Sequence, residues 1–167
     1  SDHGTATGER FGERNYGSYT YEETIRTFYL FMGSNILSNQ RISSLKSTID
    51  IFPTILDLCK ISYENNLPGI SFASELENGV TEKNENREVF SETGAVHGLY
   101  PSPEEPNVFC IKTNKYKLIY FKTPNEWSLY DLEDDPLEEK DLFGTGLYLE
   151  KELQTKLLDW INRESKY

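Results

Sequence analysis

The sequence predicts an α/β fold that is followed by a small antiparallel sheet, with a C-terminal helix packed on that sheet. Two observations lead to this class. The apolar run at 27–32 does not alternate with polar residues, which is typical of a strand covered on both faces, as in a parallel sheet. Three short apolar segments separated by turn residues lie between 108 and 132, which indicates antiparallel strands. We therefore expect two parts, 1–100 and 101–167.

The first part contains three further predicted elements. A glycine-rich polar stretch at 5–20 predicts a loop. The apolar spacing of 50–60 predicts a helix, with Asp50 at its N-cap and Pro53 in its first turn, where the missing N–H of proline costs nothing. The segment 88–92 predicts a short strand.

The second part is predicted to contain strands at 108–112, 116–121 and 127–132 and a helix at 149–164. The first two strands are close enough in the sequence to form a hairpin. The helix carries apolar residues at helical spacing, which predicts that one stripe of it faces the sheet. These residues are Leu149, Leu153, Leu157, Trp160 and Ile161.

The charge of the chain argues against a nucleic-acid partner, and the lengths of its apolar runs argue against a membrane-spanning helix. With 17 basic and 28 acidic residues the net charge is −11, so no basic excess is present to drive binding to nucleic acid. No apolar run approaches the roughly 20 residues that a membrane-spanning helix needs. Nine acidic residues against two basic ones fall in 131–152, and we interpret this segment as a solvated face. The lysines of the predicted strands, Lys112 and Lys117 among them, are interpreted as exposed.

The cysteines and the first residue indicate whether the protein contains a disulfide and whether the chain is a portion of a longer protein. Cys59 and Cys110 are far apart in the sequence, and we expect buried free thiols rather than a disulfide. The chain starts at Ser1 within what reads as a motif, so we expect that an N-terminal portion of the protein is missing. No localisation is predicted.

The first candidate for a functional site is the sequence Asp2-His3-Gly4. A carboxylate and an imidazole together suit a divalent metal ion, with or without a charged ester oxygen beside it. Neighbouring side chains of a regular strand point to opposite faces, so both can reach one point only where a strand ends, and Gly4 permits such a turn. A pair that merely caps a loop at a strand end is the alternative.

Seven short motifs follow one another along nearly the whole chain. They are Ser-Asp-His-Gly at 1–4, Tyr-Glu-Glu at 21–23, Asp-Ile-Phe-Pro-Thr at 50–54, Leu-Pro-Gly at 67–69, Arg-Glu-Val-Phe-Ser-Glu at 87–92, Tyr-Lys-Leu-Ile at 116–119 and Leu-Tyr-Asp-Leu-Glu-Asp-Asp-Pro at 129–136. In this order they resemble the sulfatase family of the alkaline phosphatase superfamily, and specifically its C-terminal portion.

The resemblance implies a fold and a partial active site. The first part would be the end of an alkaline-phosphatase-like, mostly parallel sheet. Asp2 and His3 would belong to a divalent-metal site, with calcium as the expected ion, whose other ligands lie in the missing N-terminal part of the same protein. The family's nucleophile lies in a Cys/Ser-x-Pro-x-Arg motif that this sequence does not contain, so the 167-residue chain alone is expected to be inactive.

The resemblance also implies a small anionic ester as substrate, either a sulfated sugar or an aryl sulfate. The family usually has a substrate-binding lysine just before 21–22, but 15–20 contains none, so Arg10 or Arg14 could take its place. His97 is a further candidate for substrate binding, although a lone loop histidine is more often exposed.

Three alternatives remain open from the sequence. The Asp-His form is frequent in phosphodiesterase and phosphonate-hydrolase relatives, so the ester could be a phosphate or a phosphonate. The chain could instead be a non-catalytic acidic interaction module whose working surface is 131–152. It could also be an inactive relative, in which loss of the lysine reflects loss of catalysis.

Overall fold

The computed structural model divides the chain into two compact units. The sheet unit consists of Ser1–Thr27 and Glu88–Tyr167, and the helical unit consists of Phe28–Arg87. The residues described in the structure are 1–10, 19–64, 66–79, 87–93 and 107–164.

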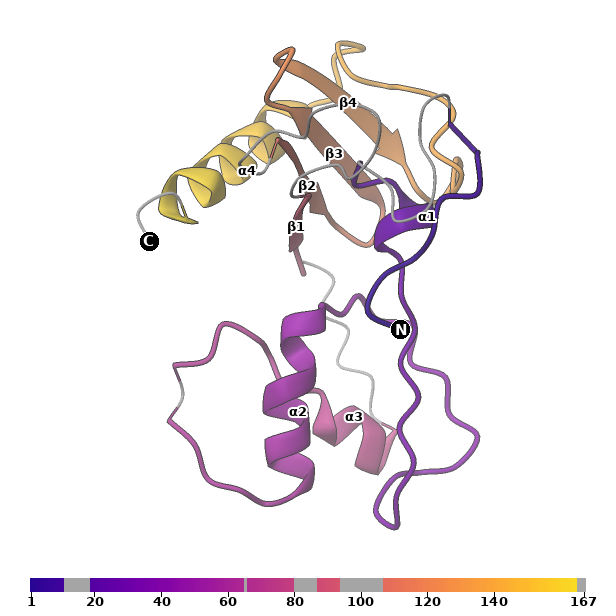
Figure 1. Ribbon diagram of the computed structural model, residues 1–167, viewed down its shortest axis with the longest axis vertical. Coiled ribbons are helices and arrows are strands. Elements are labelled where there is room, and N and C mark those ends of the chain that lie inside the picture. The colour runs from indigo at the N-terminus through magenta and orange to yellow at the C-terminus, as the bar shows by residue number, and fades with distance from the viewer. Residues whose placement is uncertain (11–18, 65, 80–86, 94–106, 165–167) are drawn as a thin grey trace. The chain divides into compact units, whose positions relative to one another are not determined.

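The sheet unit is built on four antiparallel strands in the order β1-β2-β3-β4 (Figure 1). The strands are β1 Val89–Thr93, β2 Val108–Lys112, β3 Tyr116–Phe121 and β4 Glu126–Asp131. The predicted small antiparallel sheet is confirmed, and so is the hairpin of β2 and β3, in which Cys110 lies opposite Ile119. β1 pairs with β2, so it joins the sheet of the second predicted part. The predicted division at residue 100 stays a prediction about the domains of the whole protein.

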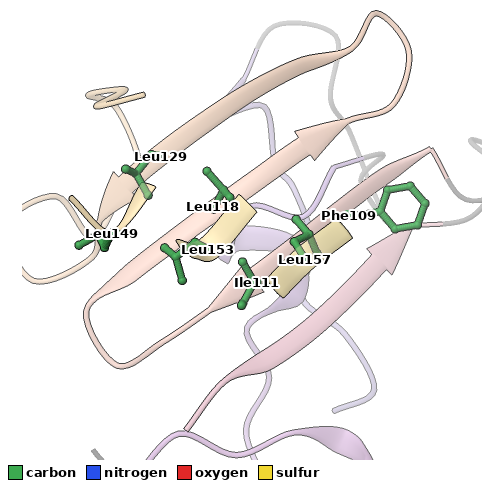
Figure 2. Packing of buried hydrophobic residues seen from close by; sticks show 7 residues of the cluster. All are labelled: Phe109, Ile111, Leu118, Leu129, Leu149, Leu153 and Leu157. Carbon is green, nitrogen blue, oxygen red and sulfur yellow. The ribbon is translucent and has the colours of Figure 1, made fainter. Parts of the chain in front are cut away.

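Helix α4, Glu150–Glu164, packs on one face of the sheet and confirms the predicted C-terminal helix. Burial of apolar side chains is the main force that holds such a helix on a sheet. Trp160 of the predicted stripe stacks on Phe90 of β1, with 5.2 Å between the ring centroids. Figure 2 shows the core of this face, which consists of Phe109, Ile111, Leu118, Leu129, Leu149, Leu153 and Leu157.

The opposite face of the sheet is covered by residues 19–25, which include the short helix α1, Glu22–Ile25. Because side chains of a strand alternate between its faces, Cys110 and Ile119 point to this side. Both cysteines are free, as predicted. Cys110 is fully buried here, and burial raises the pKa of its thiol. The expectation that Cys59 is also buried is wrong, because this thiol is exposed at the end of α2.

The helical unit contains a 3₁₀ turn, Thr48–Asp50, followed by α2, Ile51–Leu58, and α3, Ala73–Asn78. The predicted helix is therefore present, and Pro53 lies in the first turn of α2 as expected. None of the helices in the described part of the chain combines the length and the apolar composition that a membrane crossing requires.

Asp50 lies at the N-cap position of α2, as predicted, but its side chain makes no capping hydrogen bond to the helix. Its carboxylate accepts the backbone N–H groups of Ser47 and Ile70, both at 2.8 Å. It also accepts the guanidinium of Arg87, with Nη2 2.7 Å from Oδ1. Asp50 is fully buried and Arg87 nearly so, so this ion pair ties three separate segments of the helical unit together.

The apolar run at 27–32 is extended, but it is not part of the one sheet that the described residues contain. Phe28, Leu30 and Met32 are exposed to 72%, 79% and 82%, whereas the two residues between them are half-buried. The alternation is that of an extended segment with one side covered. The run therefore shows the alternating exposure of a strand, but it pairs with no strand among the described residues.

Candidate metal centre and its support

Asp2 and His3 lie with their polar atoms close together. Nδ1 of His3 donates to the carbonyl oxygen of Gly4 at 2.6 Å, which fixes the ring. Nε2 then lies 3.7 Å from Oδ2 of Asp2. A hydrogen bond from its own backbone N–H, followed by the neighbouring imidazole, lowers the pKa of the Asp2 carboxyl. The pair thus presents an anionic oxygen and a ring nitrogen toward one region.

This donor set fits part of a divalent-metal site. Two ligands that each bind at about 2.0–2.6 Å can share one ion when their own separation is near 4 Å. The side chain of Asp2 is 89% exposed, so an ion bound to its carboxylate could also be bound by ligands from outside the described residues. The described ranges hold no group of three or more His, Cys, Asp or Glu side chains that could bind a metal ion, so the pair is at most part of a site.

Gly4 fixes this pair against α1. Its N–H donates to the carbonyl oxygen of Thr24 at 2.8 Å. A β-carbon at position 4 would lie 2.2 Å from the backbone oxygen of Glu23, closer than any side chain can approach. The segment that carries Asp2 and His3 therefore lies directly on the backbone of α1, and only glycine fits at the contact.

α1 is in turn held on the sheet by an ion cluster formed by Glu22, Lys112, Lys117 and Glu138. Lys112 and Lys117 are directly opposite each other in the β2–β3 pair. Two like charges in this position repel. Glu22 bridges them, with Oε2 2.7 Å from Nζ of Lys112 and Oε1 3.1 Å from Nζ of Lys117. α1 is thus fixed where a carboxylate can meet both lysines.

Glu138 completes the ion cluster from the other side. Its Oε1 lies 2.8 Å from Nζ of Lys117, and its Oε2 accepts the backbone N–H of Glu22 at 2.7 Å. Both Lys117 and Glu138 have fully buried side chains. Burial raises the pKa of Glu22, but Lys117 and Lys112 outweigh it and hold that pKa below its usual value. Burial dominates at Glu138 and raises its pKa.

These contacts correct two interpretations of the charge pattern. Lys117 is not an exposed strand residue, since the alternation of β3 turns it toward α1. Glu138 lies within the acidic segment 131–152, yet it is buried rather than solvated. Asp135 and Asp141 also serve the fold, because each carboxylate accepts backbone N–H groups of nearby turns or strands. A part of this segment is therefore structural.

Arg10 is the substrate-binding candidate that the described residues include. Its Nε donates to Glu23 at 2.8 Å, and Nη2 and Nη1 donate to the carbonyl oxygens of Leu137 and Glu138 at 2.8 and 3.1 Å. The guanidinium also lies over the ring of Tyr21, 3.5 Å from its centroid. The structure thus gives Arg10 a role in joining α1 to the turn at 137–138. Substrate binding by Arg10 stays a prediction.

Two other candidates, Arg14 and His97, lie outside the described residues. Sequence reasoning missed Lys117 and Glu138. The one signal that could have identified Lys117 is its place in β3, between Tyr116 and Leu118, which face α4, so that it must point to the other face.

Comparison with known proteins shows similarity along most of the chain. Residues 12–166 match the family model described as N-sulphoglucosamine sulphohydrolase, C-terminal. An N-acetylglucosamine-6-O-sulfatase of Bacteroides thetaiotaomicron is 29% identical over 99% of this chain and 29% of its own length.

Two solved structures extend the similarity to the fold. One is a 2-O GAG sulfatase, with a TM-score of 0.72 and 27% identity over 87% of this chain and 32% of that protein. The other is a protein solved in complex with its substrate D-glucosamine-2-N,6-O-disulfate, with a TM-score of 0.51 and 26% identity over 70% of this chain and 23% of that protein. The chain spans about three-tenths of the length of the curated relative.

Proposed function

Because the chain belongs to the sulfatase family and matches the C-terminal portion of its members, we propose that it completes the divalent-metal site of a sulfuric ester hydrolase through Asp2 and His3. The observation that carries this proposal is the geometry of the pair. An anionic oxygen and a ring nitrogen lie 3.7 Å apart, on a segment that a glycine contact fixes to α1. The remaining ligands and the nucleophile would come from the rest of the enzyme.

Each residue of the pair has a distinct role in this proposal. Asp2 would supply a negatively charged oxygen, the ligand type that calcium prefers. His3, with Nδ1 held by the Gly4 carbonyl, would direct Nε2 toward the ion or toward an ester oxygen beside it. When bound, the ion neutralises the charge of the ester oxygens and the charge that develops as the ester is cleaved.

The names of two relatives support a substrate class. One of them is named for a sulfated sugar, N-acetylglucosamine 6-O-sulfate, and another was solved with a disulfated glucosamine. A sulfated sugar is accordingly the substrate we propose, in preference to an aryl sulfate.

The helical unit supports the proposal that the rest of the enzyme covers this chain. Twelve large apolar side chains are exposed among the described residues, and nine of them lie in 28–87. Exposed apolar surface of this extent is typical of an interface. Three of them, Phe28, Leu30 and Met32, lie along one side of an extended segment that could receive a neighbouring strand. We propose that the remaining part of the same protein occupies this surface.

The first prediction concerns the 167-residue chain by itself. It should hydrolyse neither sulfated N-acetylglucosamine nor an aryl sulfate, with or without added calcium, because the proposed site is incomplete without the other ligands and the nucleophile. Release of inorganic sulfate from both substrates is the measurement, with the intact enzyme as positive control. Turnover by the isolated chain above that of a heat-denatured sample would contradict the proposal.

The second prediction concerns the intact enzyme. Asp2→Ala should reduce calcium affinity and sulfatase activity together, because it removes the one charged ligand of the pair. Calcium content after gel filtration and the rate of sulfate release are the two measurements. Asp134→Ala is the matched control, since Asp134 is an exposed aspartate of the same unit. A fully active Asp2→Ala enzyme without bound calcium would exclude the ligand role.

A further inference from the structure

The ion cluster is unusual because burying its charged groups costs free energy. Taking charges out of water is expensive, and well-packed apolar residues of similar volume often stabilise a fold at least as well as a buried ion pair. Lys117 and Glu138 nevertheless have no exposed side-chain surface, and they pair with each other beneath α1, with Nζ 2.8 Å from Oε1. What the charges add over apolar packing is a defined position, because a carboxylate between two lysines has one favourable location.

A short series of contacts makes the position of residues 2–4, near the N-terminal end, depend on the ion cluster. Glu22 is held by Lys112 and Lys117 through its side chain and by Glu138 through its backbone N–H. Its neighbour Glu23 is held from the other side by Arg10. The first two residues of this short helix are thus held by charged groups, Glu22 by the ion cluster and Glu23 by Arg10.

The next contact joins α1 to the proposed metal ligands. Gly4 donates to Thr24 and lies so close to Glu23 that no β-carbon fits between them. Gly4 also accepts the hydrogen bond that orients His3. A shift of α1 would therefore shift Gly4, and with it the ring nitrogen and the carboxylate of the ligand pair.

From this arrangement we propose that Lys117 and Glu138 are positioning residues for the metal site, which act on Asp2 and His3 through α1 and Gly4. This inference rests on the proposed function, since it presupposes that Asp2 and His3 bind the ion. It goes further in assigning residues of the antiparallel sheet and its following turn to the support of the site. Residues that orient metal ligands typically change metal affinity 10–100-fold when they are replaced.

The test is calcium binding by the intact, metal-stripped protein, measured by isothermal titration calorimetry with calcium chloride. Lys117→Met and Glu138→Gln should each weaken calcium binding by about 10–100-fold. The matched control is Lys156→Met, because Lys156 also pairs with two glutamates of the sheet unit, Glu88 and Glu152, but belongs to α4. This control should bind calcium as the unaltered protein does.

A fourth variant separates positioning from stability. Gly4→Ala keeps every side chain of the ion cluster but forces the ligand segment and the backbone of α1 apart. It should weaken calcium binding about as much as Lys117→Met, with little change in the thermal unfolding midpoint. Gly4→Ala also tests the inference if Lys117→Met does not fold. Weaker calcium binding by a folded Gly4→Ala protein supports the inference, and unchanged calcium binding overturns it.

Asp2→Ala in the same titrations distinguishes the two proposals. Unchanged calcium affinity in Asp2→Ala would overturn the proposed function itself. Reduced affinity in Asp2→Ala, together with unchanged affinity in folded Lys117→Met and Glu138→Gln proteins, would overturn the positioning role and leave the proposed function standing.

Discussion

Asp50→Ala is expected to destabilise the helical unit by about 3–5 kcal/mol, because it leaves the buried guanidinium of Arg87 without its carboxylate. The backbone N–H groups of Ser47 and Ile70 lose their acceptor in the same step. In the intact protein, amide hydrogens of α2 should then exchange at least about a hundredfold faster, since each 1.4 kcal/mol is a factor of ten. Hydrogen-exchange mass spectrometry of peptides that cover 51–58 measures this effect.

Asp134→Ala serves as the control for this experiment. Asp134 is an exposed aspartate outside the helical unit, and such substitutions usually change stability by no more than about 0.5 kcal/mol. Unaltered exchange of α2 in Asp50→Ala would mean that the ion pair does not hold the three segments together.

Leu157→Ala should destabilise the sheet unit by about 2–5 kcal/mol. Leu157 is fully buried at the centre of the contact between α4 and the sheet, so the substitution removes apolar contacts and leaves a cavity (Figure 2). The expected readout is faster hydrogen exchange in α4 and in the central strands β2 and β3, with the helical unit unaffected.

The neighbouring residue provides the comparison. Leu158 follows Leu157 in the same helix but is exposed to 39%, so Leu158→Ala should change exchange far less at equal helix propensity. Equal effects of the two substitutions would show that α4 does not pack on the sheet through the face that contains Leu157.

Local patterns were sufficient to predict most of the sheet unit. The strands at 108–112 and 116–121 were predicted at their observed bounds, because short apolar segments between turn residues specify a hairpin without any distant partner. The helix with Leu149 and Leu153 was likewise visible from its spacing. The run at 27–32 was less informative, because apolar content indicates burial but not which strand lies beside it.

The charged groups could not be predicted in the same way. Glu22 meets Lys117 across 95 residues and Glu138 across 116, and no local spacing relates them. Glu138 stands among eight other acidic residues of 131–152, where solvation is the usual outcome for a carboxylate. Asp2 and His3 were accessible to sequence reasoning because they are adjacent, whereas the residues that support them are distant.

The discontinuity of the sheet unit has a consequence for biosynthesis. A ribosome releases Asp2 and His3 well before it has made Lys117 and Glu138, with the whole helical unit synthesised in between. If Asp2 and His3 bind the ion as proposed, and if the ion cluster sets their geometry, the metal site is completed only when the turn after β4 has emerged. Polypeptides that terminate earlier would contain both ligands and still bind calcium poorly, so loading with the ion would distinguish finished chains from unfinished ones.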